Sequence, residues 1–118
     1  MQECPPDDLS VRITEVTRPN ACVLALLGST GAWNVTVLEQ AFQNAGATGR
    51  PLVVDLSGLD FGDEVLLGFL LHAYTTPRGL VLLGPVTGAF ARRLYRTGVD
   101  ELFKTQQTLA LALAQLPE

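Results

Sequence analysis

Apolar and polar residues alternate at the start of the chain, where the stretch "LSVRITEV" at 9–16 places Leu9, Val11 and Ile13 on one side of an extended strand. This period of two is typical of a strand with one face in the core and the other in solvent. Three later runs are apolar throughout and bounded by turn residues, as in strands covered on both faces: "CVLALL", "PLVVDL" and "GLVLLG". We therefore predict one half-buried strand near a sheet edge and three buried central strands.

A helical period follows the second predicted strand. The residues expected on the buried face of this helix are Trp33, Val37, Leu38, Ala41, Phe42 and Ala45. Gly46 is expected to end it, because glycine commonly follows the last helical turn.

Two further helices are predicted in the last third of the chain. One begins near Thr87, a candidate N-cap, buries Phe90 and Leu94, and runs toward Gly98. Its arginines are expected in solvent: Arg92, Arg93 and Arg96. The tail "TLALALAQL" alternates strictly, which also fits a strand, but its leucine spacing and its Ala and Leu content favour a helix.

The most apolar segment is "LDFGDEVLLGFLL" at 59–71. It starts where a predicted strand ends, and we predict that it continues as a helix. Apolar side chains spread around the whole circumference of this helix, and a domain this small should leave one face uncovered. We therefore predict a protein-binding surface on its outer face, with Leu66 and Phe69 as the candidates for outward-facing positions. Gly62 and Gly68 would allow a close backbone approach.

The order of elements is two strands, a helix, a strand, a helix, a strand and two helices. It predicts an α/β fold: a small single domain with a mixed sheet of four to five strands covered by about four helices. A chain of 118 residues with 47% hydrophobic content suits one core. We expect a flexible leader at 1–8 and the domain at 9–118.

Composition and charge exclude several functions. The net charge of −4 argues against nucleic-acid binding, which needs a basic surface. No apolar run is long enough to cross a bilayer, and we expect a cytoplasmic protein. Of the two cysteines, Cys22 fits a small core residue and Cys4 lies in the leader. His72 stands alone, and "GSTG" lacks the lysine of a phosphate loop, so we expect no enzyme activity, no cofactor and no metal.

Four short motifs resemble the STAS domain, the fold of bacterial anti-sigma-factor antagonists. They are Asp-Leu-Ser-Gly at 55–58, Phe-x-Asp at 61–63, Gly-Pro at 84–85 and Thr-Gly-x-Asp-x-Leu-Phe at 97–103. The resemblance covers nearly the whole chain, from about Leu9 to Leu116. It implies a module that binds an anti-sigma factor. This anti-sigma factor is often also a serine kinase, and it is released once it has phosphorylated a serine at the start of the module's second helix.

The chain departs from the family pattern at this serine. Where the family reads Asp-Ser-Ser-Gly or Asp-Ser-Thr-Gly, this chain reads Asp63, Glu64, Val65, Leu66. Glu64 therefore occupies the phosphoacceptor position and cannot be phosphorylated. The nearest hydroxyl is Ser57, which we expect the strand end to shield. Near Gly31 the chain also lacks the acidic residue that the family associates with kinase engagement.

Two interpretations of Glu64 remain open. A carboxylate at a helix N-terminus is stabilised by the helix dipole, so Asp63 and Glu64 could simply be capping residues. Alternatively, Glu64 is a partial mimic of phosphoserine, with a charge of −1 in place of about −1.5 to −2.

We therefore expect a regulatory module that binds an anti-sigma factor, or a related partner-switching protein, without the serine phosphoswitch. The expected partner-binding residues are Asp63, Glu64, Val65, Leu66, Gly68 and Phe69. The alternative is a non-phosphorylatable assembly subunit or scaffold that pairs with itself, as a homodimer, or with another STAS domain.

Overall fold

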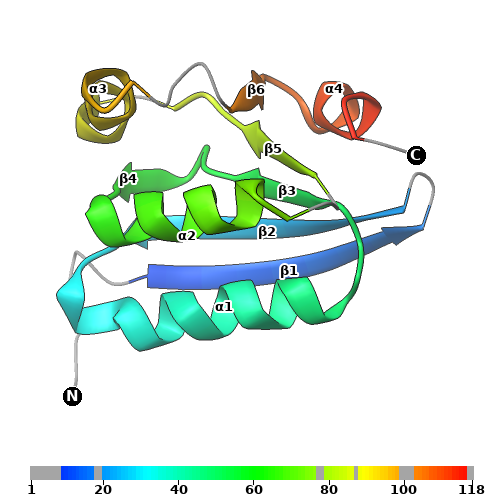
Figure 1. The fold of residues 1–118 in the computed structure, drawn as a ribbon, viewed down its shortest axis with the longest axis horizontal. Helices are drawn as coiled ribbons and strands as arrows, with labels where there is room; N and C mark the ends of the chain where they lie inside the picture. The colour runs from blue at the N-terminus through cyan, green and yellow to red at the C-terminus, as the bar shows by residue number, and fades with distance from the viewer. Residues whose placement is uncertain (1–8, 18–19, 77–78, 87, 99–102, 117–118) are drawn as a thin grey trace.

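The computed structural model describes residues 9–17, 20–76, 79–86, 88–98 and 103–116. The expected leader at 1–8 and the expected cap at Thr87 lie outside these residues. The elements are, in chain order, β1 (Leu9–Thr17), β2 (Asn20–Ser29), the 3-10 turn η1 (Ala32–Asn34), α1 (Val35–Ala47), β3 (Leu52–Asp55), β4 (Leu59–Phe61), α2 (Glu64–Tyr74), β5 (Leu80–Leu83), α3 (Gly88–Arg96), β6 (Lys104–Gln106) and α4 (Leu109–Ala114) (Figure 1).

One mixed sheet joins all six described strands. Its order is β1-β2-β3-β5-β6, and β4 pairs with the end of β2. The first two strands are antiparallel, whereas β2, β3, β5 and β6 run parallel to one another. The predicted α/β fold, with a mixed sheet and its first strand at one edge, is therefore confirmed. The two strands that the pattern did not predict, β4 and β6, have three residues each.

The two faces of the sheet are covered unequally. Side chains on one face pack with α1, α2 and α3 in the larger core, which includes Leu24, Val54 and Leu82 from the strands. On the opposite face, Val53 and Val81 pack with Ala112 of α4 and with Leu116 just after it. Successive side chains of a strand point to opposite faces, which explains why neighbouring residues of β3 and β5 enter different cores.

Cys22 lies in the larger core with no exposed surface and is a free thiol, as expected. Its burial raises the pKa of the thiol, because the charged thiolate is disfavoured away from water.

The predicted buried face of α1 is partly wrong. Leu38, Ala41 and Ala45 are buried, but Trp33 is 60% exposed and Val37 is 46% exposed. The helix begins at Val35, so Trp33 belongs to the preceding 3-10 turn and does not follow the helical period. Its ring lies so close over Gly31 that a Cβ atom there would come within 2.2 Å of the ring.

Candidate functional site

The turn before α2 is held by two buried side chains. Asp63 is the N-cap of α2, and its Oδ1 accepts a hydrogen bond of 3.2 Å from the Leu66 N–H. The same oxygen accepts a hydrogen bond of 2.8 Å from the Thr30 hydroxyl. In return, the Thr30 hydroxyl accepts a hydrogen bond of 3.0 Å from the Asp63 N–H. Because Thr30 has no exposed surface and Asp63 is 8% exposed, this reciprocal pair fixes the turn in a dry environment.

The loop that carries Thr30 is itself fixed. The Asn34 side chain donates to the Ser29 carbonyl at 2.9 Å and accepts from the Gly31 N–H at 3.0 Å. Asn34 is also buried. The loop after β2 and the turn before α2 therefore form one hydrogen-bonded unit. The sequence identifies Asp63 but not Thr30 or Asn34, because no local pattern shows that these two side chains hold the turn before α2.

Glu64 points away from this buried pair. Its side chain is 75% exposed, and its Oε2 lies 3.5 Å from Nη1 of Arg93 on α3. An exposed ion pair of this length contributes little to stability. Asp63 is thus the residue whose side chain caps the helix, while Glu64 presents a carboxylate to solvent in the first turn, where the helix dipole favours it.

The exposed part of α2 is smaller and more polar than the apolar composition of this helix suggests. The buried residues are Leu66, Leu67, Leu70 and Ala73. The expectation that Leu66 could point outward is wrong, since its side chain has no exposed surface and packs in the larger core. The outward stripe consists of Glu64, Gly68 and His72, flanked by the half-buried Val65 and Phe69.

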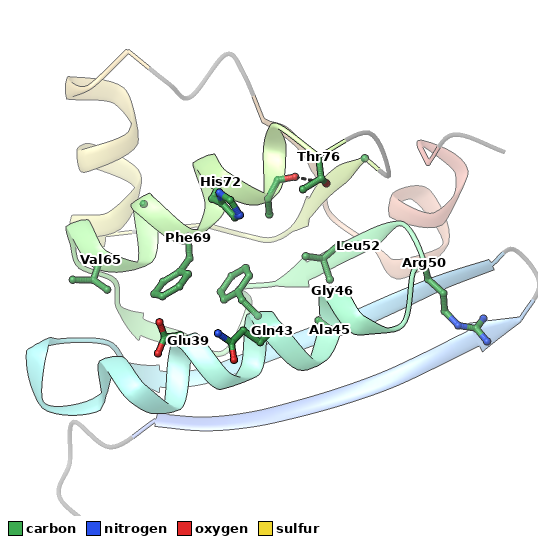
Figure 2. A pocket seen from close by; sticks show the side chains of 14 residues that line it. Glu39, Gln43, Ala45, Gly46, Arg50, Leu52, Val65, Phe69, His72 and Thr76 are labelled. Atoms are coloured by element: carbon green, nitrogen blue, oxygen red, sulfur yellow. Dashed lines mark hydrogen bonds between the residues drawn. The ribbon is translucent and has the colours of Figure 1, made fainter.

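Val65, Gly68 and Phe69 border a groove between α1 and α2 with a volume of about 660 Å³ (Figure 2). The Phe69 ring stacks on the ring of Phe42 from α1, with centroids 5.3 Å apart. Further apolar lining comes from Leu52 and Ala73, and Figure 2 shows Glu39, Gln43 and His72 beside the groove. Of the six predicted partner-binding residues, Glu64 and Gly68 are exposed and Val65 and Phe69 are half-buried, whereas Asp63 and Leu66 are buried.

The two glycines of this region have different surroundings. A Cβ atom on Gly62 would lie 2.6 Å from the Phe90 ring, so glycine lets α3 pack against the turn. A Cβ atom on Gly68 would meet nothing within 4 Å. The backbone of α2 at Gly68 is therefore open to a molecule approaching from solvent.

Ser57 is exposed, contrary to the expectation that the strand end shields it. Its hydroxyl donates to Asp55 Oδ1 at 2.6 Å, and its N–H donates to the same oxygen at 3.0 Å. The hydroxyl is thus engaged locally but remains at the surface.

Among the described residues, no helix is long and apolar enough to span a membrane. Within the same part of the chain, no three His, Cys, Asp or Glu side chains gather as a metal site would require.

Comparison with known proteins decides the family. The family model STAS_2, described as "Mlab, STAS domain", matches residues 13–112. The chain belongs to this STAS family. The resemblance seen in the four sequence motifs is thereby confirmed.

Solved structures with the same fold include anti-sigma factor antagonists. The STAS domain superposes on an anti-sigma factor antagonist from Mycobacterium paratuberculosis with a TM-score of 0.82 and 26% sequence identity, covering 97% of this chain and 98% of the other. It also matches the anti-sigma factor antagonist SpoIIAA in its unphosphorylated form, with a TM-score of 0.65 and 18% identity over 90% of this chain and 95% of that one. The phosphorylated form of SpoIIAA, from Bacillus, matches with a TM-score of 0.64 and 17% identity over 90% and 98% of the two chains. At these identities, the likeness to SpoIIAA shows the fold alone. No curated protein matches the chain.

Proposed function

We propose that this STAS domain is a regulatory protein-binding module of the anti-sigma factor antagonist type that works without a serine phosphoswitch. It binds a kinase-like anti-sigma factor, or a related partner-switching protein, through the Asp63 turn and the outward face of α2. The observation that carries the proposal is the rigid turn made by Thr30 and Asp63, which presents the exposed Glu64 carboxylate where the family carries a phosphorylatable hydroxyl.

The geometry of the turn supports a binding role. A buried aspartate whose Oδ1 accepts two hydrogen bonds fixes the start of α2, so little conformational entropy is lost there when a partner docks. Beside it, Gly68 leaves the helix backbone accessible and Phe69 offers a half-buried aromatic side chain. Aromatic anchors next to a groove are typical of binding surfaces between proteins.

Glu64 gives this surface a charge that a kinase cannot change. Its partner within the domain is Arg93 at 3.5 Å, and both side chains are accessible to a second protein. We favour a permanently binding module over a module locked in the released state, because Phe69, Gly68 and the groove form a surface suited to a partner. A mimic of the released state would instead bind more tightly once Glu64 is replaced by serine.

The surface is tested by titrating the wild type and Phe69→Lys against a kinase-like anti-sigma factor from the same genome, using calorimetry. We expect Phe69→Lys to weaken binding about tenfold or more, because a charge replaces an aromatic anchor. Leu111→Lys is the matched control, since Leu111 is an exposed leucine on α4. Equal affinities of the wild type and a folded Phe69→Lys variant would contradict the proposed surface.

The missing phosphoswitch is tested separately by mass spectrometry after incubation with the same anti-sigma factor and ATP. We expect no phosphate on residues 57–66 of the wild type, where Ser57 is the one hydroxyl side chain. Glu64→Ser restores a hydroxyl at the family's position and serves as the positive control. A phosphate on Ser57 of the wild type, lost in Ser57→Ala, would show that a phosphoswitch exists after all. The same Glu64→Ser variant, titrated before phosphorylation, would bind at least tenfold more tightly than the wild type if Glu64 mimicked phosphoserine.

A further inference from the structure

Strand β1 is the longer edge of the sheet. It pairs with β2 along all nine residues in a continuous antiparallel register, and it is the end member of the strand order (Figure 1). Edge strands expose backbone groups that can pair with another strand, and proteins often protect them with bulges or prolines. The register of β1 contains no bulge, and its sequence contains no proline.

Two hydrogen bonds of β2 show which backbone groups of β1 point outward. The N–H of Cys22 donates to the Pro51 carbonyl at 2.8 Å, and the N–H of Gly28 donates to the Gly58 carbonyl at 3.0 Å. Both bonds lie on the side of β3 and β4, away from β1. Because backbone groups of successive strand residues point to opposite sides, the even-numbered residues of β2 all turn away from β1.

The register then identifies the outward-facing residues of β1. Glu15, Ile13 and Val11 lie opposite even-numbered residues of β2. In an antiparallel pair, two opposite residues either exchange both hydrogen bonds with each other or direct both groups away. The N–H and C=O groups of Val11, Ile13 and Glu15 therefore face the open edge, while those of Arg12 and Thr14 bond to β2.

An apolar hollow lies beside the same edge. It is bordered by Val11 and Ile13 of β1 and by Val37 and Ala41 of α1, and has a volume of about 550 Å³. Ile13 is 36% exposed and Val37 is 46% exposed, two of the large apolar side chains left at the surface. Two of the three residues whose backbone groups face the open edge, Val11 and Ile13, thus also line the hollow with their side chains. This is the arrangement of a site that accepts an added strand.

We propose that the added strand is β1 of a second copy of this chain, paired antiparallel about a twofold axis at Ile13. In this register, Ile13 lies opposite its own counterpart, and Val11 lies opposite Glu15 of the second copy, so outward-facing backbone groups meet each other. Arg12 lies opposite Thr14 of the second copy, so no two like charges stand directly opposite each other. The two sheets join, and the exposed Ile13 and Val37 side chains are covered.

The two edges of the sheet favour a closed pair over a chain of copies. A head-to-tail contact would pair β1 with β6, but β6 has only three residues against the nine of β1. Pairing of β1 with itself uses the whole strand and leaves no second edge of comparable length among the described strands, which closes the assembly at two copies. The negative charge of Glu15 is also compensated within each copy by Arg50, whose Nε lies 3.0 Å from Glu15 Oε1.

This dimer is independent of the proposed partner site, which lies on α2 and uses other residues. A failure of one proposal therefore leaves the other standing. Sedimentation equilibrium over a wide concentration range tests the assembly, and we expect a species of twice the 12.7 kDa chain mass. Ile13→Lys should weaken dimerisation about tenfold or more, because it places two ammonium groups opposite each other at the edge.

Leu111→Lys is again the control, because it removes an exposed apolar side chain from α4 and should leave the dimer intact. Thermal unfolding confirms that both variants fold. A wild type that remains monomeric at every concentration would overturn the proposal, as would a dimer that a folded Ile13→Lys variant still forms.

Hydrogen exchange measured residue by residue distinguishes strand pairing from any other contact. In the monomer, the amides of Val11, Ile13 and Glu15 should exchange fast, while those of Arg12 and Thr14 are protected by β2. In the dimer, exchange at Val11, Ile13 and Glu15 should slow as the protein concentration rises. A dimer in which these three amides still exchange fast would place the interface elsewhere and refute β1 pairing.

Discussion

Thr30 links the two halves of the candidate site through a single hydroxyl. It donates to Asp63 and accepts from the Asp63 N–H, across a separation of 33 residues in the sequence. The cap role of Asp63 could be predicted because it is local: an aspartate directly before a run of helix-forming residues is a helix start signal. The role of Thr30 could not be predicted, because nothing in the spacing of residues shows which distant hydroxyl will meet a buried carboxylate.

Replacing Thr30 with valine should destabilise the protein, because Val has nearly the same shape but can neither donate to nor accept from Asp63. We expect a loss of about 1–3 kcal/mol of unfolding free energy, toward the upper end because the stranded group is a carboxylate. Thr30→Ser keeps the hydroxyl and should cost only about 0.8 kcal/mol for the lost methyl group. Urea unfolding of both variants provides the measurement. If Thr30→Val proved as stable as Thr30→Ser, the hydrogen-bonded pair would not hold the turn.

At the scale of elements, the predictions held where a period extended over several turns or residues. The central strands follow from their continuous apolar runs, and α1 and α3 follow from the 3.6-residue period, which are strong signals. Helix α4 follows instead from its leucine spacing and its Ala and Leu content. The strands β4 and β6 were missed, because "LDF" and "KTQ" are too short to show a period and pair only where an existing strand offers an edge. Trp33 was misplaced because the pattern could not show that a 3-10 turn precedes α1.

The glycines near α2 offer a test at the same scale. Gly68→Ala should stabilise the protein by about 0.5–1 kcal/mol, because alanine favours the helix and the added Cβ atom meets nothing within 4 Å. Gly62→Ala should instead destabilise it, because its Cβ atom would collide with the Phe90 ring at 2.6 Å. Thermal unfolding compares the two variants. A destabilising Gly68→Ala would mean that the surface of α2 is more crowded than the structure shows.

At the scale of the whole molecule, the two proposed binding surfaces use different elements of the domain. The Asp63 turn opens α2, whereas β1 is the edge strand of the sheet and lies beside α1 (Figure 1). The α/β class and the mixed sheet followed from the order of elements, since strand-helix-strand units cross over between parallel strands. The accessible face of α2 did not follow from its composition, because burial of Leu66 and Leu70 depends on the packing of α3 and the sheet, which the chain order alone does not reveal.

The unequal cover of the two sheet faces has a consequence for how this protein is made. The smaller core joins Val53 and Val81 to Ala112 and Leu116, residues from the middle and the end of the chain. A nascent chain that has already formed β3 and β5 on the ribosome must therefore keep an apolar face of its sheet bare until the stretch after Thr108 has been synthesised. During that interval the bare face is available to chaperones or to neighbouring nascent chains. The share of the protein that reaches the native state should then depend on translation rate and chaperone supply during that interval.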